Sequence, residues 1–423
     1  MLSRFQTITA SVCLLVCFSC GQTKQAPPSA PEKPKTPPVS SIDVPKDREA
    51  NDVARFLAGL KGNPGSPFAE SESSAAWKTY SAAFDTDFAR YETKRIPAMR
   101  AFQKSELSGP VFDGANLFYP FGGPDFLNAL IFFPDRENYF FIGLEPPGSV
   151  PTFKQFEGQD MATQLPRMRK TLRSLLSLSY FQTLEMAIQV KGQITDGLLP
   201  VMLVQMARSG FEVLGSTPVT IDDRGFIVRP EDVKEEPAPE LVAGKKAPAP
   251  IKRTPGIVIA FRKEGGTKIQ KLYYFSTDVI DLSIKKNKPF LAFLPRMEPM
   301  DAMYKAASYL SHRESFSIIR SKVLELAQAV VEDDSGIPYR FFDHDTWDIT
   351  LYGGYTTPIP IFVNRMQPDL REAYKNGVIP VKSLDFGIGY SVSQHMSNLL
   401  VAKRKPAAVA SIPKPAGGAA QKP

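Results

Sequence analysis

The densest group of side chains that could do chemistry lies in the stretch EDDSGIPYRFFDHDTWD, residues 332–348. Carboxylate oxygens at this density suit Ca²⁺ or Mg²⁺, and an imidazole between two acids is a candidate general base. The spacing of an ordered calcium-binding loop is absent, which favours a second interpretation, a solvated helix end followed by an acidic turn. The candidate metal ligands are Asp333, Asp334, Asp343, His344 and Asp345.

A second pair of carboxylates flanks the most apolar part of the chain. The runs Leu127–Phe133 and Tyr139–Leu144 hardly alternate in polarity, which predicts a β-hairpin buried on both faces. Asp125 lies in FGGPDF and Glu145 begins EPPG, so the two carboxylates could face each other as a general acid–base pair. Asp beside Gly and Pro is also a common turn residue, and the turn-capping interpretation is favoured.

Other catalytic signatures are absent from the sequence. There is no GxSxG elbow, no GxxxxGK[ST] phosphate loop, no HExxH and no CxxC. All three cysteines, Cys13, Cys17 and Cys20, lie in the first twenty residues, which excludes thiol catalysis and thiolate metal sites in the rest of the chain. We therefore predict no cofactor, apart from the divalent cation considered above.

The amino-terminal segment has the pattern of a secretion signal. Arg4 precedes an apolar run, 8–18, that has the length of a secretory h-region and is too short to span a bilayer. With Ser19 and Cys20, this segment resembles a bacterial lipoprotein signal, although Cys17 and Phe18 stand where the common pattern has Leu and a small residue. A plain cleaved signal peptide is the alternative.

The lipoprotein resemblance implies a location as well as a modification. It implies that Cys20 is acylated, becomes the first residue of the mature chain and anchors it in the lipid bilayer of the bacterial cell envelope. Several acyl chains hold such an anchor stably, since each buried CH₂ contributes about 0.8 kcal/mol. Gly21 follows Cys20 in place of an acid, which implies the outer membrane, with the protein facing the periplasm or the cell surface.

Proline divides the chain into segments. Pro-rich stretches with few large apolar groups predict disorder near residues 20–47, 230–255 and 403–423. The resulting organisation is a signal peptide (1–19), a linker (20–47), a body (48–402) with a disordered excursion (230–255), and a Lys/Pro/Ala tail (403–423). The length favours one large bilobal domain or two domains, with a lobe boundary near residue 296.

The body mixes helical and strand patterns. Apolar positions at helical spacing predict helices within 48–62, 74–102, 163–191, 196–211, 315–336 and 369–377. Strand patterns occur at 211–215, 218–222, 226–230, 256–262, 267–275, 346–355 and 382–392. Sequence-neighbouring strands joined by short turns predict an antiparallel sheet with helices packed on it, an α+β fold.

The net charge of +7 does not indicate a nucleic-acid partner. Most of the excess lies in Arg4 and in the tail 403–423, which has five basic residues and no acid, so the body is close to neutral. A body that binds nucleic acid normally has an uneven charge balance and a basic face, and we exclude this class.

These observations leave three hypotheses for function. The first is a membrane-anchored envelope lipoprotein that acts as a non-catalytic binding or assembly module, with other envelope proteins as possible partners. The second is a metal-assisted hydrolase of envelope polymers that uses the acidic cluster around His344. The third is a structural lipoprotein that contacts peptidoglycan through its basic tail.

Overall fold

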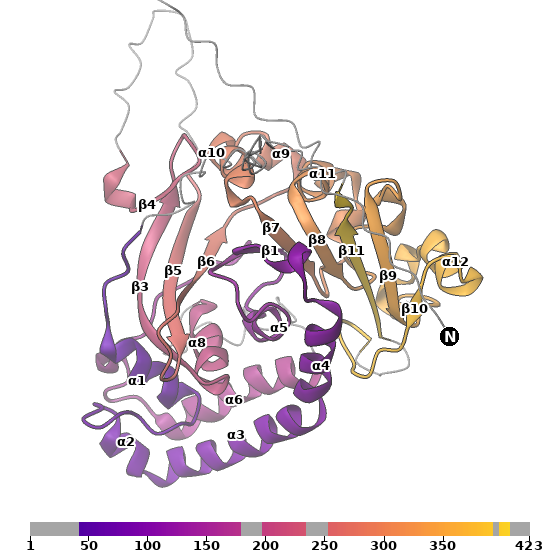
Figure 1. The fold of residues 1–423 in the computed structure, drawn as a ribbon. Coiled ribbons are helices and arrows are strands. Elements are labelled where there is room, and N and C mark those ends of the chain that lie inside the picture. Colours follow the sequence, from indigo (N-terminus) through magenta and orange to yellow (C-terminus); the bar gives the residue numbers. More distant parts are fainter. Residues whose placement is uncertain (1–41, 179–196, 234–252, 392–396, 407–423) are drawn as a thin grey trace, which may run out of the picture. The chain divides into compact units, whose positions relative to one another are not determined.

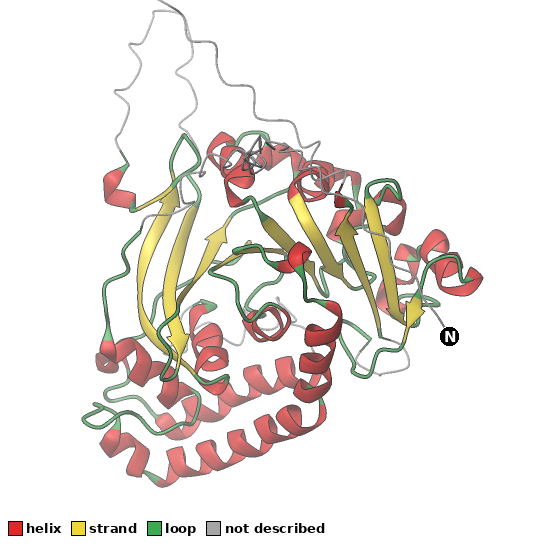
Figure 2. Ribbon diagram, in the orientation of Figure 1, coloured by secondary structure: helices red, strands yellow, loops and turns green. Residues whose placement is uncertain are grey.

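The computed structural model describes residues 42–178, 197–233, 253–391 and 397–406. Within these residues, helices surround one mixed sheet of eleven strands (Figure 1, Figure 2). The predicted fold of helices packed on a sheet is therefore confirmed. No helix in the described ranges is both long enough and apolar enough to cross a membrane.

The strands at the centre of the sheet run parallel, and those at its flanks are mixed. Across the sheet they lie in the order β10 (Val381–Lys382), β9 (Trp347–Gly353), β11 (Asn398–Arg404), β8 (Ala327–Glu332), β7 (Met300–Tyr304), β1 (Asn116–Pro120), β2 (Asn138–Gly143), β6 (Ile269–Ser276), β5 (Pro255–Lys263), β3 (Phe211–Ile221) and β4 (Ile227–Val228).

The expectation of an antiparallel sheet is wrong for this centre. β8, β7, β1, β2 and β6 pair in parallel, whereas β11 is antiparallel to both β8 and β9. Antiparallel pairing is found where β11 meets β8 and β9, and at the other flank in the pairs β5 with β6, β3 with β5, and β3 with β4. Parallel partners are brought together by helical crossovers, which leave no turn signal between them in the sequence.

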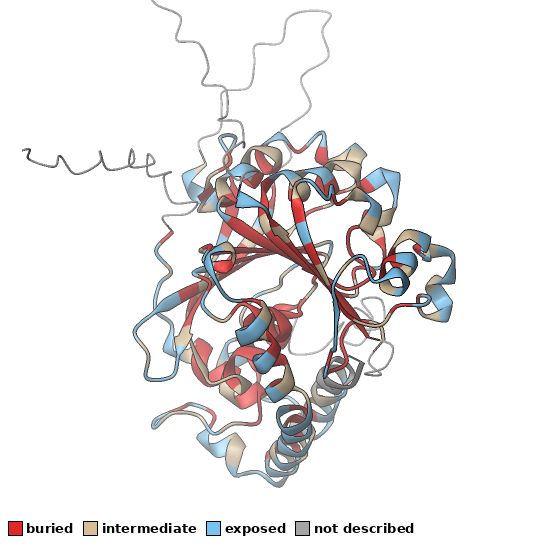
Figure 3. Ribbon diagram, turned by 45° about the vertical axis from the view of Figure 1, so that its right-hand side comes forward, coloured by how far each residue is buried: buried red, intermediate tan, exposed pale blue. Residues whose placement is uncertain are grey.

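Helices cover both faces of the sheet and bury it (Figure 3). Side chains alternate along each strand, so Leu117 and Tyr119 of β1 pack into one core and Phe118 into the other. The first layer comprises α1 (Arg48–Leu57), α3 (Ala75–Lys94), α4 (Ile96–Glu106), α5 (Phe126–Phe132), α6 (Met161–Leu178) and α8 (Leu199–Arg208), and the short α2 (Ala69–Ser73) precedes α3. The second layer comprises α9 (Asp281–Ile284), α10 (Lys288–Phe293), α11 (Ser317–Leu326) and α12 (Pro368–Asn376).

The apolar run 127–133 is a helix, which corrects the predicted hairpin. α5 is buried on all sides and connects β1 to its parallel neighbour β2. The other strand of the predicted hairpin, at 139–144, corresponds to β2. A short run that is apolar at every position carries no periodicity, so the sequence could not distinguish a buried helix from a buried strand.

The helix predicted over 315–336 ends earlier than its apolar stripe. α11 stops at Leu326, and Val330 belongs to β8. Asp333 and Asp334 therefore follow the carboxyl end of a parallel strand, which corrects their placement at a helix end. The apolar pattern of the sequence continued past the end of α11 because the buried parallel strand that follows is also apolar at successive positions.

Several local predictions are confirmed. The aromatic residues of α3 form a buried face, α3 and α4 meet just before Pro97, and the turns of the β3–β4 and β5–β6 hairpins fall where predicted. The buried aromatic residues of α3 are Trp77, Tyr80, Phe84, Phe88 and Tyr91. The predicted closing strand at 382–392 is wrong for the residues described there, 382–391, because of these only Lys382 belongs to a strand of the sheet; the last strand of the described chain is β11.

The ordered body extends beyond its predicted ends. Ile42 is buried and its carbonyl oxygen accepts a hydrogen bond from Lys271, so the chain from residue 42 packs on the sheet. At the other end β11 includes Lys403 and Arg404, and the Arg404 guanidinium lies 4.6 Å from the Trp347 ring. The predicted boundary near residue 296 falls just before β7, which pairs with β1 in the middle of the sheet.

Candidate ligand site at the carboxyl edge of the sheet

The order of the strands creates a switch point between β1 and β7. After β1 the chain enters α5 on one face of the sheet, and after β7 it enters α11 on the other face. The loops that follow these two neighbouring strands therefore diverge and leave a crevice at the carboxyl edge. In open α/β sheets, ligands bind in such crevices.

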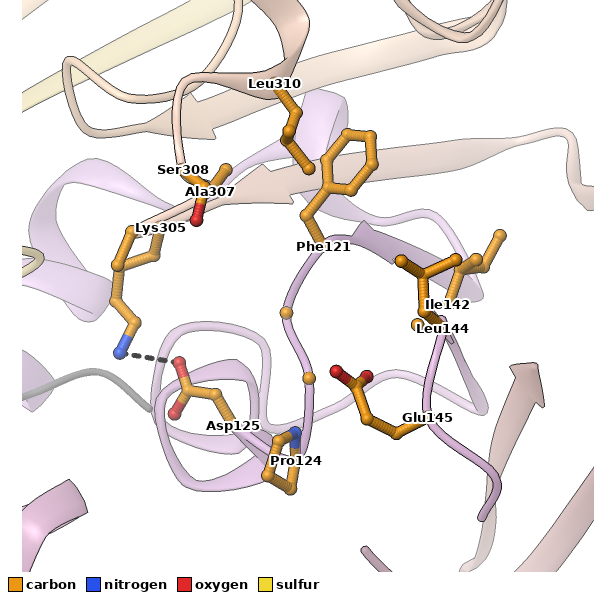
Figure 4. Close-up of a pocket in the computed structure, with 14 residues that line it drawn as sticks. Phe121, Pro124, Asp125, Ile142, Leu144, Glu145, Lys305, Ala307, Ser308 and Leu310 are labelled. Atoms are coloured by element: carbon orange, nitrogen blue, oxygen red, sulfur yellow. Dashed lines mark ion pairs between the residues drawn. The ribbon is translucent and has the colours of Figure 1, made fainter. Parts of the chain in front are cut away.

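A cavity of about 150 Å³ lies at this switch point. Its walls come from the turn after β1, from the end of β2 and from the loop after β7 (Figure 4). Asp125 and Glu145, the two carboxylates of the predicted acid–base pair, both line it. Asp125 makes no capping hydrogen bond at the start of α5, so the turn-capping interpretation does not describe it.

Asp125 forms a buried ion pair with Lys305. The Lys305 ammonium lies 2.7 Å from Asp125 Oδ2, and both side chains are almost fully buried (Figure 4). The Tyr119 hydroxyl donates to the same oxygen at 2.9 Å, and Asn128 donates to Oδ1 at 2.7 Å. These four groups satisfy the buried charge and hold the turn after β1 against the loop after β7.

Backbone strain is concentrated in the two loops of this site. Among the described residues, the non-glycine residues with left-handed φ are Phe121, Ala306, Ser308 and Tyr309, with φ between 49° and 62°. Each such residue costs about 1 kcal/mol or more, and conformations of this kind cluster at ligand sites. All four lie in the turn after β1 or the loop after β7.

Hydrogen bonds from the loop after β8, and from Tyr390 between β10 and β11, hold the strained loop after β7 in place. Asp333 Oδ2 accepts from the Ala306 amide at 2.9 Å, and Ser335 Oγ accepts from the Ala307 amide at 2.7 Å. The Tyr390 hydroxyl accepts from the Ser308 amide and donates to the Ala306 carbonyl oxygen. The Asp333 carboxylate therefore holds in place the loop that lines the cavity.

Asp334 anchors a second buried network. It accepts hydrogen bonds from the Tyr309 hydroxyl at 2.5 Å and from the Asn398 amide at 3.1 Å. Burial, together with the neighbouring Asp333 carboxylate, raises the pKa of Asp334 to about 7. His312 lies against the Asp334 carbonyl oxygen, and burial lowers the pKa of its imidazole to about 4.

Glu332 belongs to the same buried region. Its carboxylate accepts from the Ile337 amide at 2.7 Å, and burial raises its pKa well above the usual range. We call Asp125, Glu332, Asp333 and Asp334 the buried acidic cluster. All four lie at or just beyond the carboxyl ends of parallel strands.

The remaining predicted metal ligands lie elsewhere. Asp343, His344 and Asp345 form an exposed acidic turn before β9, and we use this name for them below. Asp343 caps the turn by accepting from the Asp345 amide and from the Thr346 hydroxyl. The five candidates therefore do not form one site, and the part of the chain that the structure describes contains no group of three or more metal-ligating side chains that could hold an ion.

Glu145 is the free acceptor of the cavity. Its side chain is half-buried and has no hydrogen-bond or ion-pair partner among the described residues. The Tyr274 hydroxyl donates to its carbonyl oxygen at 3.1 Å and fixes the end of β2. Phe121, Leu144 and Leu310 form an apolar rim on one side of the cavity (Figure 4).

Sequence reasoning missed Lys305, Ser335, Tyr309 and Tyr390, which hold the site together. The only signal in the sequence was the FGGPD turn followed, after two apolar runs, by Glu145. Cys20, the predicted lipidation site, lies outside the described residues. No protein-family model, no curated protein and no solved structure matches this chain.

Proposed function

We propose that the body of this protein is a binding module for a ribonucleoside, held at the switch-point cavity. The observation that carries the proposal is the position of Glu145 in the β1–turn–α5–β2 unit. In doubly wound sheets, an acidic residue about 20 positions beyond the glycine-rich turn accepts hydrogen bonds from ribose hydroxyls. Glu145 lies about that far beyond Gly123, and its carboxylate has no other partner among the described residues.

The charges at the cavity favour a ligand without phosphate. Lys305 is already neutralised by Asp125, which leaves Glu145 as the unbalanced charge of the lining. A phosphate would approach this carboxylate with no free cation to offset the repulsion. A neutral or cationic nucleoside suits the site, for example adenosine or the sulfonium compound S-adenosylmethionine.

The size of the cavity fits part of such a ligand. A volume of about 150 Å³ is smaller than the ~300–1,000 Å³ of complete ligand pockets, so it suits the sugar. The base would then lie over the apolar rim of Phe121, Leu144 and Leu310. Aromatic and aliphatic side chains at a rim provide a surface for the face of a base.

Calorimetric titration of the full chain with adenosine, 2′-deoxyadenosine, ribose and AMP tests this proposal. We expect adenosine to bind more tightly than AMP and more tightly than 2′-deoxyadenosine, because the carboxylate accepts from the ribose hydroxyls. Ribose alone binding as well as adenosine would identify a sugar site instead. Tighter binding of AMP than of adenosine would contradict the charge argument.

The variant Glu145→Gln, with Glu157→Gln as matched control, tests the residue itself. Loss of a hydrogen bond to a charged group costs about 1.5–3 kcal/mol, which corresponds to roughly a 10–100-fold loss of affinity. Glu157 is exposed and does not line the cavity, so its variant should bind normally. Equal affinities of the two variants would show that Glu145 does not contribute to ligand binding.

We also propose that the module is displayed in the cell envelope through an acylated Cys20. The support is the lipoprotein-like amino terminus and the absence of any other cysteine after it. Incorporation of labelled palmitate into wild type and Cys20→Ala tests the anchor. Label that persists in Cys20→Ala would show that lipidation occurs at another residue.

The hydrolase hypothesis and the peptidoglycan hypothesis depend on different parts of the chain. The hydrolase hypothesis requires the acidic residues around His344, and these lie on the exposed acidic turn apart from Asp333 and Asp334. The peptidoglycan hypothesis depends on the tail, most of which lies beyond the described residues, and it stays a prediction. Equal recovery on cell-wall material with and without residues 407–423 would exclude it.

A further inference from the structure

We propose a second ligand site, for a free fatty acid, in the helical layer. A cavity of about 720 Å³ lies between α3, α4, α5 and the turn that joins β5 to β6. This volume is within the ~300–1,000 Å³ of small-molecule pockets. The elements that line it can be followed in Figure 1.

The floor of this cavity is apolar. Ile96 of α4 and Leu127, Leu130 and Ile131 of α5 are buried beneath it, and Phe211 at the start of β3 is partly buried beside them. None of these side chains offers a hydrogen bond. Such a surface suits an aliphatic chain, because burial of each CH₂ group is favourable.

The mouth of the cavity is basic. Arg100 and Lys104 of α4 and Lys263 of β5 line it, are exposed and have no ion-pair partner among the described residues. Lys268 and Arg208 add positive charge, but Lys268 donates to the Asp135 carbonyl oxygen and Arg208 pairs with Asp85.

Glu92 and Asp135 are the acids of the lining, so cations outnumber them. An apolar floor below unpaired cations recognises an anionic amphiphile with a single chain. A carboxylate head meets the three unpaired cations at the mouth, while the acyl chain covers the floor. The exposed cations can approach the carboxylate without breaking an existing ion pair, and a charge-assisted contact of this kind is stronger than a neutral hydrogen bond.

This site is separate from the switch-point cavity. Asp125, at the amino-terminal end of α5, lines the first cavity, whereas Leu130, Ile131 and Pro134, at the other end, line the second. The two proposals therefore fail independently: loss of nucleoside binding says nothing about fatty-acid binding.

A chain-length series tests the apolar floor. The full chain carrying Cys20→Ser, which lacks the proposed anchor, is titrated with octanoate, decanoate and dodecanoate below their micelle concentrations. Each buried CH₂ contributes about 0.8 kcal/mol, so affinity should rise about fourfold per added CH₂ group. Affinity that does not change with chain length would overturn the proposal.

Head-group and charge variants test the mouth. Dodecylammonium should bind at least tenfold more weakly than dodecanoate, and Lys104→Glu should reduce dodecanoate affinity several-fold. Lys94→Glu makes the same charge change on an exposed part of α3 outside the lining and should have little effect. Equal losses in the two variants, or equal binding of the two head groups, would exclude a specific carboxylate site.

A cavity-filling variant, Leu130→Trp, adds an independent readout. It should abolish binding of dodecanoate while leaving a cooperative urea unfolding transition, which reports that the chain is folded. Because Lys104 is exposed, the Lys104→Glu result stands even if Leu130→Trp fails to fold. Undiminished dodecanoate binding by a folded Leu130→Trp variant would place the ligand elsewhere.

Discussion

Three members of the buried acidic cluster, Glu332, Asp333 and Asp334, lie close in the sequence to the exposed acidic turn but have a different environment in the structure. Asp333 and Asp334 are buried, accept several hydrogen bonds each and support the loop after β7. Asp343, His344 and Asp345, a few residues further on, are exposed. Among the described residues, the Asp343 carboxylate accepts hydrogen bonds only from its own turn. Both groups are rich in acidic residues, but only the buried one supports a distant loop.

The difference follows from the strand next to each group. β8 belongs to the parallel centre of the sheet, and its carboxyl end opens into the crevice between β1 and β7. The exposed acidic turn leads into β9, which lies beyond β11 toward the edge of the sheet. A carboxylate is enclosed at this sheet where neighbouring parallel strands end together. Four variants of the buried region, each compared with a variant in or against the exposed acidic turn, test that conclusion.

Removal of Lys305 should have the largest effect on stability. In Lys305→Met, Asp125 stays buried without its cation, which typically costs about 3–5 kcal/mol. Lys405→Met, which removes a cation that donates to the His344 carbonyl oxygen on the exposed acidic turn, should cost about 0.5 kcal/mol or less. Urea unfolding of both variants measures the difference, and similar losses would contradict the comparison.

Asp333→Asn should have the next largest effect. The amide replaces one acceptor oxygen by a donor that faces the Ala306 or the Ser335 amide, and an unsatisfied buried group costs about 1–3 kcal/mol. Asp343→Asn on the exposed turn should be less destabilising, because water replaces the lost acceptor. Equal denaturation midpoints for these two variants would show that burial does not govern the cost.

The pH dependence of stability should differ in sign between the two regions. The pKa of Asp334 is raised to about 7 by burial, so the folded state binds the proton more tightly than the unfolded state. The contribution of Asp334 to stability is therefore present below its unfolded pKa of about 4 and is lost as the pH rises toward 7. Asp334→Asn should flatten this slope.

Asp343 provides the opposite case. The Thr346 hydroxyl and the Asp345 amide lower its pKa, so its contribution is present above the unfolded value and is lost as the pH falls. Urea midpoints of wild type, Asp334→Asn and Asp343→Asn between pH 3 and pH 8 measure both slopes. An unchanged slope in Asp334→Asn would show that another group carries the titration.

Ser308→Gly should have the smallest effect, and a favourable one. Ser308 has φ of 52°, and glycine adopts left-handed backbone without the steric cost, so the variant should be unchanged or more stable by up to about 1 kcal/mol. His344→Gly on the exposed turn removes no left-handed strain and should give no gain. A loss of stability in Ser308→Gly comparable to that in Asp333→Asn would contradict the strain argument.

Local features of the fold could be predicted from the sequence because their causes are local. The aromatic face of α3 follows from helical spacing, and the turn of the β3–β4 hairpin follows from Asp222 and Gly225. Asp125 and Glu145 could be singled out because turn residues mark the ends of apolar runs. That they line one cavity depends on β1 and β2 being parallel, and the chain between them contains no signal for that pairing.

The sequence by itself determined the secretion-like amino terminus, the cysteine-free body, the near-neutral charge of that body and the helices and strands whose patterns are periodic. Only the tertiary structure decided that 126–132 is a helix, that Asp333 follows a strand and that Lys305 meets Asp125. The physical reason is that uniformly apolar segments carry no periodicity, and parallel strands pair through distant crossovers. The site therefore depends on contacts between segments that are far apart in the chain.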